Sequence, residues 1–177
     1  QTQRRFDLTV TKKDYFRMIE MKTGALFAAA SGLAARISGR DEAICEAMHG
    51  YGMKLGTAYQ IYDDVVDIIG TEEVTGKTLG TDLEKGKLTL PILNLLDTAT
   101  PKQKEKLTKR IIEQEPLDLH ILGGIADYEG AVDDALKTAS QLVAEARGSL
   151  SLLNASEFTT ALEDITLYVD QLLKSCR

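Results

Sequence analysis

Residues 59–91 read YQIYDDVVDIIGTEEVTGKTLGTDLEKGKLTLP. The first part of this stretch has the apolar spacing of a helix, and Asp63, Asp64 and Asp67 lie near the end of that helix. In an α-helix Asp63 and Asp67 fall about 40° apart on one face, with Asp64 beside them. Like charges this close destabilise a helix, and a divalent cation such as Mg²⁺ removes that penalty. Because the neighbouring residues are apolar, we expect the three carboxylates to face a cavity.

A glycine-rich segment with lysines follows the carboxylates directly. It contains the steps Gly76-Lys77 and Gly86-Lys87 and lacks helical periodicity. Glycine lets backbone N–H groups approach an oxyanion closely, and lysine binds a diphosphate as a mobile point charge. We therefore expect residues 71–88 to form a functional loop that, with the carboxylates, binds a metal-bound diphosphate.

The rest of the chain has the apolar periodicity of helices and no strand-like alternation. The expected helices cover about 11–37, 42–69, 88–96, 101–115, 130–150 and 157–174. Capping residues are expected at Thr11, Asp41, Thr100 and Ser156. Residues 117–129 are expected to be irregular or to form a short helix. The sequence therefore predicts an all-α protein with one helical region over residues 1–177.

The first expected helix carries a set of residues at helical spacing, which are Tyr15, Ile19, Lys22, Leu26, Ala30, Leu33 and Ile37. The small residues of 24–35 permit either close helix packing or a wide tunnel, and the sequence leaves both open.

Composition excludes several classes of protein. The net charge is −6, which argues against a nucleic-acid-binding surface, and no apolar run reaches the about 18 residues that span a bilayer. Cys45 and Cys176 lie far apart and form neither a metal motif nor a disulfide framework, so we expect free thiols in the reducing cytoplasm. The chain starts at Gln1 without a methionine, and we expect it to be part of a longer protein.

The stretch resembles the second aspartate-rich region of the trans-isoprenyl diphosphate synthases, the polyprenyl synthetases. The family pattern is Gln-x-x-Asp-Asp-x-x-Asp, followed by Gly-Lys-x-x-Gly-x-Asp-x-x-x-Gly-Lys-x-Thr-x-Pro. The matching residues are Gln60, Asp63, Asp64, Asp67, Gly76, Lys77, Gly80, Asp82, Gly86, Lys87, Thr89 and Pro91. A second element, Lys22-Thr23, resembles the Lys-Thr helix of the family. The resemblance implies the helical bundle of the isoprenoid synthases, of which this chain is the C-terminal part.

The resemblance also implies a reaction. Family members join an allylic diphosphate to isopentenyl diphosphate head to tail, use Mg²⁺, and are usually homodimers. By resemblance, the metal is held by Asp63, Asp64 and Asp67. The allylic diphosphate is bound by Lys22, Lys77 and Lys87. The Thr23 carbonyl and the Gln60 side chain face the developing cation, and Asp82 and Thr89 order the loop.

The chain departs from the family pattern in one respect. An earlier aspartate-rich motif followed by paired arginines is absent; Arg4-Arg5 has no acidic motif before it, and Asp133-Asp134 is followed by no arginines. We therefore expect this chain to be inactive alone. The length of the product is not specified by the residues present.

Two other functions remain open. A class I terpene cyclase shares the fold and the chemistry of metal-bound diphosphates, although the paired Gly-Lys steps argue against it. A non-catalytic regulatory subunit of a prenyl synthase is the second alternative, although such a subunit has no physical need for clustered like charges. A third alternative is a helical bundle whose acidic turn arose by chance. It does not account for the match of both the aspartate-rich region and the Lys22-Thr23 step to the family pattern.

Overall fold

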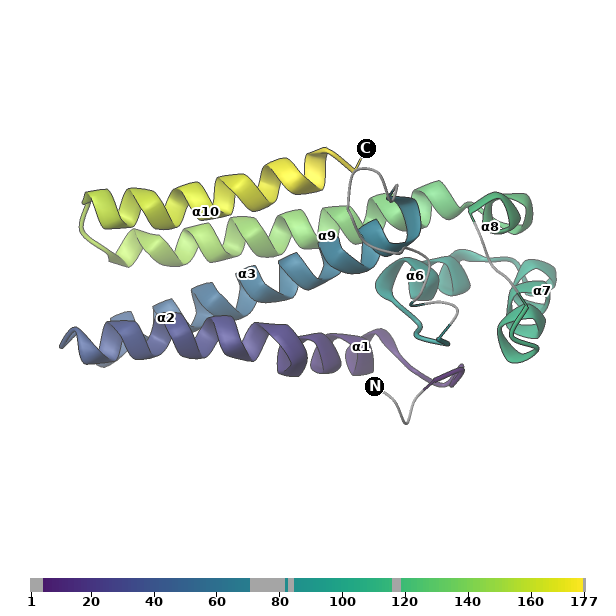
Figure 1. Cartoon of the computed structure of the whole chain (residues 1–177), viewed down its shortest axis with the longest axis horizontal. Helices are drawn as coiled ribbons and strands as arrows, with labels where there is room; N and C mark the ends of the chain where they lie inside the picture. The colour runs from purple at the N-terminus through teal and green to yellow at the C-terminus, as the bar shows by residue number, and fades with distance from the viewer. Residues whose placement is uncertain (1–4, 71–81, 83–84, 116–118, 177) are drawn as a thin grey trace. The chain divides into compact units, whose positions relative to one another are not determined.

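A computed structural model describes residues 5–70, 82, 85–115 and 119–176, and these residues contain helices and no strand (Figure 1). The α-helices are α1 (Lys12–Ile19), α2 (Ala25–Ile37), α3 (Glu42–Ile69), α6 (Leu90–Thr98), α7 (Pro101–Ile112), α8 (Leu119–Ile125), α9 (Tyr128–Ser149) and α10 (Glu157–Lys174). A π-helix, η2 (Glu20–Gly24), separates α1 from α2, and a 3-10 helix, η3 (Leu150–Leu152), follows α9. The all-α prediction is confirmed for the described residues.

The starts of four helices follow the predicted capping residues. In each case a side-chain oxygen accepts a hydrogen bond from the backbone N–H three residues further on. These bonds measure 3.1 Å at Thr11, 2.9 Å at Asp41, 3.4 Å at Thr100 and 3.2 Å at Ser156. Local sequence signals therefore determine where these helices begin.

The helices form two compact units. The first unit combines the residues up to Tyr15 with Asp63–Leu136 and contains α6, α7 and α8. The second combines Phe16–Tyr62 with Lys137–Ser175 and contains α2 and α10. The long helices α3 and α9 contribute residues to both units.

In the second unit, helices α2, α3, α9 and α10 lie side by side (Figure 1). Tyr51 on α3 donates a hydrogen bond to the Leu162 carbonyl of α10 at 2.9 Å. Arg147 on α9 donates to the hydroxyl of Thr166 on α10 at 2.8 Å, and Thr166 is completely buried. Polar bonds therefore accompany the apolar packing between these helices.

Glycines bring η2 and α2 into close contact with α3. A Cβ added to Gly24 would lie 2.8 Å from the sulfur of Met53, and one added to Gly56 would lie 3.0 Å from the Cα of Gly24. Such distances leave no room for a side chain, so these small residues permit close packing of the helices. Of the two roles that the sequence left open, close packing is the one that the structure shows for these glycines.

The π-helix changes which face of the helix is buried. A π-helix has one residue more per hydrogen-bonded turn than an α-helix, so the apolar spacing of α1 does not continue into α2. The buried positions of η2 and α2 are Gly24, Ala28, Gly32 and Ala35. Leu26, Leu33 and Ile37, which share the helical spacing of Tyr15 and Ile19 in the sequence, are exposed by 73%, 55% and 85%. The helical spacing therefore does not mark one buried face beyond Ile19.

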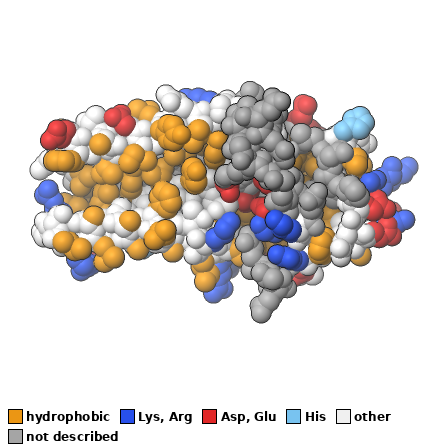
Figure 2. Space-filling model, viewed as in Figure 1, with side chains coloured by type: hydrophobic (Ala, Val, Ile, Leu, Met, Phe, Trp, Pro, Cys, Tyr) orange, Lys and Arg blue, Asp and Glu red, His pale blue; other side chains and the backbone are white. Residues whose placement is uncertain are grey.

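Hydrophobic side chains gather on the surface of the second unit (Figure 2). Besides Leu26, Leu33 and Ile37 on α2, α10 exposes Phe158 and Tyr168. Exposed apolar areas of this kind are typical of surfaces that another polypeptide covers.

Buried tyrosines make the stability of the fold dependent on pH. Burial raises the pKa of Tyr51 to about 12, and burial also raises the pKa of Tyr128. Because these values lie above the unfolded value of about 10, the stabilisation is complete below about pH 10 and is lost as the pH rises through the folded values.

We therefore expect the free energy of unfolding to fall as the pH is raised beyond about 10. The fall should be smaller in Tyr51→Phe, which has no phenol at this position to ionise. Urea unfolding at a series of alkaline pH values measures it. The same slope in the wild type and in Tyr51→Phe would contradict the prediction.

Candidate functional site

The end of helix α3 places four predicted site residues on consecutive turns. Gln60 and Asp64 are buried, with 5% and 3% of their surface exposed, and Asp63 and Asp67 are half-buried. The carboxylates thus occupy the spacing and the helix that the sequence predicts. A buried carboxylate such as Asp64 needs a hydrogen-bond donor, since burial without one is costly.

Tyr15 supplies such a donor to Asp64. Its phenol donates a hydrogen bond of 2.7 Å to Oδ2 of Asp64, from α1 to α3 within the first unit. Burial, together with the neighbouring Asp64 carboxylate, raises the pKa of Tyr15 well above its ordinary value, whereas a hydrogen bond with the Leu90 backbone acts in the opposite direction. The phenol is therefore protonated, and able to donate, throughout the neutral range. Sequence analysis missed this role, because the residues are far apart in the chain and only the aromatic character of Tyr15 was visible.

Asp82 connects the third carboxylate to a lysine. Its backbone N–H donates to Oδ2 of Asp67 at 2.9 Å, and its carbonyl accepts the backbone N–H of Lys87 at 2.8 Å. The Asp82 carboxylate also forms an ion pair with the ammonium group of Lys87. Most of the predicted loop of residues 71–88 lies outside the described residues, so its ordering by Asp82 stays a prediction.

Thr89 makes no comparable side-chain contact among the described residues. Its hydroxyl oxygen is buried and has no hydrogen-bond partner among the described residues, although Thr89 precedes the first turn of α6. A side-chain hydrogen bond from Thr89 therefore does not order the described part of the loop. Buried polar atoms without a partner are uncommon in proteins and often mark the place of a further polar group.

The backbone near Lys87 is held by an N-terminal residue. Phe6 donates its backbone N–H to the Gly86 carbonyl at 2.8 Å. Gly86 has φ of +70°, and a Cβ there would lie 2.6 Å from the ring of Phe6. Only glycine both adopts a positive φ without strain and leaves room for the Phe6 ring, which explains why a glycine precedes Lys87.

Lys22, Thr23 and Gln60 lie in the second unit. Thr23 donates its hydroxyl to Oε1 of Gln60 at 2.7 Å, and Lys22 is exposed. Lys22 and Thr23 both belong to the π-helix η2, and π-helical turns occur frequently at functional sites. This hydrogen bond joins η2 to α3, and the roles predicted for Lys22, Thr23 and Gln60 stay predictions.

Lys77 lies outside the described residues, as do Gly76 and Gly80. Within the described part of the chain, no three His, Cys, Asp or Glu side chains are arranged so that they alone could hold a metal ion.

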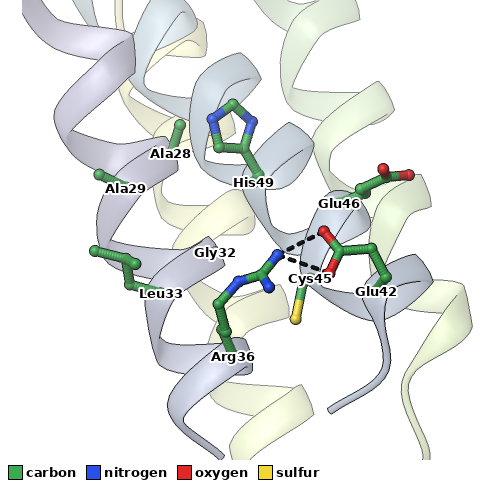
Figure 3. A pocket seen from close by; sticks show the side chains of 9 residues that line it. All are labelled: Ala28, Ala29, Gly32, Leu33, Arg36, Glu42, Cys45, Glu46 and His49. Atoms are coloured by element: carbon green, nitrogen blue, oxygen red, sulfur yellow. Dashed lines mark hydrogen bonds and ion pairs between the residues drawn. The ribbon is translucent and has the colours of Figure 1, made fainter. Parts of the chain in front are cut away.

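A groove of about 450 Å³ opens between α2 and α3 in the second unit (Figure 3). It is lined by Ala28, Ala29, Gly32, Leu33, Arg36, Glu42, Cys45, Glu46 and His49. Arg36 and Glu42 pair at its edge, with one bond of 2.7 Å. The groove contains none of the predicted site residues.

Comparison with known proteins identifies the family. Residues 1–122 match the sequence model of the polyprenyl synthetase family. The chain belongs to this family. It is 34% identical over 158 residues to a geranylfarnesyl diphosphate synthase from Natronomonas pharaonis, with 88% of this chain and 45% of that protein covered. It is 33% identical over 162 residues to a short chain isoprenyl diphosphate synthase from Methanothermobacter thermautotrophicus, with 92% and 50% covered.

Solved structures of polyprenyl synthetases confirm the predicted fold. A decaprenyl diphosphate synthase from Rhodobacter capsulatus superposes with a TM-score of 0.86 at 28% identity, covering 100% of this chain and 54% of that one. A polyprenyl synthase from Caulobacter crescentus, solved in complex with calcium and isoprenyl diphosphate, superposes with a TM-score of 0.85 at 32% identity. The match covers 96% of this chain and 52% of that one. The chain therefore spans about half the length of these relatives.

Proposed function

We propose that the protein carrying this chain is a trans-prenyltransferase, which condenses an allylic diphosphate with isopentenyl diphosphate to make a linear prenyl diphosphate. Membership of the polyprenyl synthetase family supports this function. The observation that carries it is the position of Asp82, which donates its N–H to Asp67 and pairs its carboxylate with Lys87. Carboxylates suited to a metal and a lysine suited to a diphosphate are thereby joined in one site.

Asp63, Asp64 and Asp67 would hold Mg²⁺. Their oxygen atoms are the donors that this ion prefers, and Mg²⁺ usually takes only one or two protein carboxylates, with water and substrate phosphates as its other ligands. Such sharing fits a site in which the described side chains alone do not enclose a metal. When bound, Mg²⁺ polarises the diphosphate oxygens and neutralises the charge of the leaving group.

Lys22, Lys77 and Lys87 would bind the allylic diphosphate. The ion pair holds the Lys87 ammonium group on the Asp82 carboxylate before substrate arrives, and the Asp82 backbone N–H binds Asp67. A diphosphate carries more charge than one carboxylate, so it competes effectively for this lysine. The buried hydroxyl of Thr89, two residues further on, is a further polar group available to the substrate.

Thr23 and Gln60 would act on the organic part of the substrate. The hydrogen bond from the Thr23 hydroxyl fixes the Gln60 amide, so the orientation of its dipole is set before substrate binds. We assign the Gln60 side chain and the Thr23 carbonyl to stabilising the allylic cation that forms when diphosphate leaves. The double bond of isopentenyl diphosphate then attacks this cation, a carbon–carbon bond forms, and a proton is lost.

The whole protein would contain more than this chain. We propose that the chain forms the C-terminal part of a single isoprenoid synthase domain, that it is inactive by itself, and that the whole protein works as a homodimer. The exposed apolar side chains of α2 and α10 support this, because further polypeptide would cover them. Two free cysteines, Cys45 and Cys176, suit the reducing cytoplasm. No helix in the described ranges has the length and apolarity to cross a bilayer.

An elongation assay tests the proposed function. The whole protein is incubated with a short allylic diphosphate, labelled isopentenyl diphosphate and Mg²⁺, and the label is extracted into organic solvent and sized by chromatography. We expect linear products, and loss of these products when Mg²⁺ is chelated. A cyclic hydrocarbon would favour a terpene cyclase. Folded protein that elongates only with a partner protein would favour a regulatory subunit.

A further inference from the structure

Tyr15 forms a buried pair with one of the proposed metal ligands. The phenol is 2% exposed and Asp64 is 3% exposed, and the two oxygen atoms lie 2.7 Å apart. A hydrogen bond from a hydroxyl to an ionised carboxylate is shorter and stronger than one between neutral groups. The pair therefore fixes the Asp64 carboxylate within the first unit.

The position of Tyr15 is itself determined by its surroundings. Thr11 caps the first turn of α1, and the Tyr15 N–H donates to the Thr11 carbonyl at 3.0 Å, so the residue begins the helical ladder. The Leu90 backbone, at the start of α6, is a second hydrogen-bonding partner of the phenol. Three helices thus converge on one hydroxyl, and the ring cannot turn away from Asp64 without loss of packing.

We propose that Tyr15 is a positioning residue, which orients the Asp64 carboxylate and thereby sets the affinity of the site for its metal-bound diphosphate. The phenol does so through Asp64 and touches neither metal nor substrate. This inference rests on the proposed function. It differs from a purely structural role, because loss of the phenol should weaken metal binding more than loss of an equally buried phenol elsewhere.

Tyr51 provides that matched comparison. It is 3% exposed, and its hydroxyl donates one hydrogen bond of 2.9 Å to the Leu162 carbonyl, in the second unit. Tyr15→Phe and Tyr51→Phe each remove one buried hydroxyl and retain the ring. Tyr15→Phe should cost more stability, because it removes a donor to a buried carboxylate, so Mn²⁺ binding is compared under conditions in which both variants are fully folded.

The test compares metal binding in the whole protein and its variants. Mn²⁺ replaces Mg²⁺, and its binding in the presence of inorganic diphosphate is followed by electron paramagnetic resonance. We expect Tyr15→Phe to weaken Mn²⁺ binding about tenfold or more, as is typical when a partner of a metal ligand is removed. Tyr51→Phe should bind Mn²⁺ as the wild type does. In elongation assays, Tyr15→Phe should need a correspondingly higher Mg²⁺ concentration for half-maximal rate.

A double variant shows whether Tyr15 acts through Asp64. In Asp64→Asn the ionised partner of the phenol is gone, so adding Tyr15→Phe should change Mn²⁺ binding by less than about twofold, because the two groups act as a unit. If Tyr15→Phe alone does not fold, the double variant still should, because it leaves no buried charge without its donor, and a tenfold or larger effect of Tyr15→Phe in Asp64→Asn would then overturn the proposal.

Several outcomes would overturn the proposal. Equal Mn²⁺ affinity in Tyr15→Phe and Tyr51→Phe would do so, as would an undiminished effect of Tyr15→Phe in Asp64→Asn. Elongation by the wild type in those cases would leave the proposed function intact. Failure of the folded wild type to elongate would instead refute the proposed function, and the Mn²⁺ comparison would still decide the role of Tyr15.

Discussion

Replacing Asp63 with asparagine should lower the rate of prenyl elongation by the whole protein about a hundredfold to a thousandfold, the loss typical when one group that stabilises developing charge is removed. The Asp63→Asn substitution keeps the size of the side chain and removes its charge. Asp63 is half-buried at the end of α3, beside the buried Asp64, so its charge is only partly screened by water. The measurement is single-turnover formation of extractable product at saturating Mg²⁺.

Asp134→Asn is the matched control. Asp133 and Asp134 form another adjacent pair of aspartates on a long helix, α9, and both are exposed. An exposed charge that contacts no substrate contributes little to catalysis, so Asp134→Asn should elongate at the wild-type rate. If Asp63→Asn retains more than about a tenth of the rate, its carboxylate supplies less than about 1.4 kcal/mol, and the assignment of Asp63 as a metal ligand is wrong.

Local signals predicted the helices well. Caps such as Thr100 and Asp41 act within one turn, so the residues that determine a helix start are adjacent in the sequence. Helix α6 begins at Leu90, two residues later than expected, with Pro91 in its first turn as predicted. The carboxylate spacing on α3 was also predictable, since it depends only on the helical repeat.

Features that depend on tertiary contacts could not be read in this way. Tyr15 and Asp64 are 49 positions apart, and no spacing rule connects α1 with α3. The link from Asp82 to Asp67 uses a backbone N–H, which every residue except proline has, so the side chains carry no signal for it. The π-helix η2 could not be recognised from the spacing of apolar residues, so the sequence did not show which residues of α2 are buried.

The close contact between α2 and α3 depends on Gly52, so replacing this glycine should strongly lower the stability of the protein. A Cβ at this position would overlap the Phe27 carbonyl oxygen and the Ser31 hydroxyl oxygen of α2. The Ser31 hydroxyl lies 2.8 Å from the Phe27 carbonyl oxygen and 2.7 Å from that of Met48, and its single hydrogen is shared between them, so the added methyl group would also disturb the bond that joins the two helices. We expect Gly52→Ala to destabilise the protein by about 2–4 kcal/mol, the cost of overpacking combined with a lost hydrogen bond.

Gly50→Ala separates this effect from helix propensity. Gly50 lies two residues away on the same helix, and a Cβ there would meet nothing within 4 Å. Alanine is favoured over glycine in a helix interior by about 0.5–1 kcal/mol, so Gly50→Ala should stabilise the protein by that amount. Urea unfolding of both variants should give free-energy changes of opposite sign. A stabilised Gly52→Ala would mean that α2 and α3 move apart at little cost, and the small residues of α2 would then need another explanation, such as the tunnel that the sequence left open.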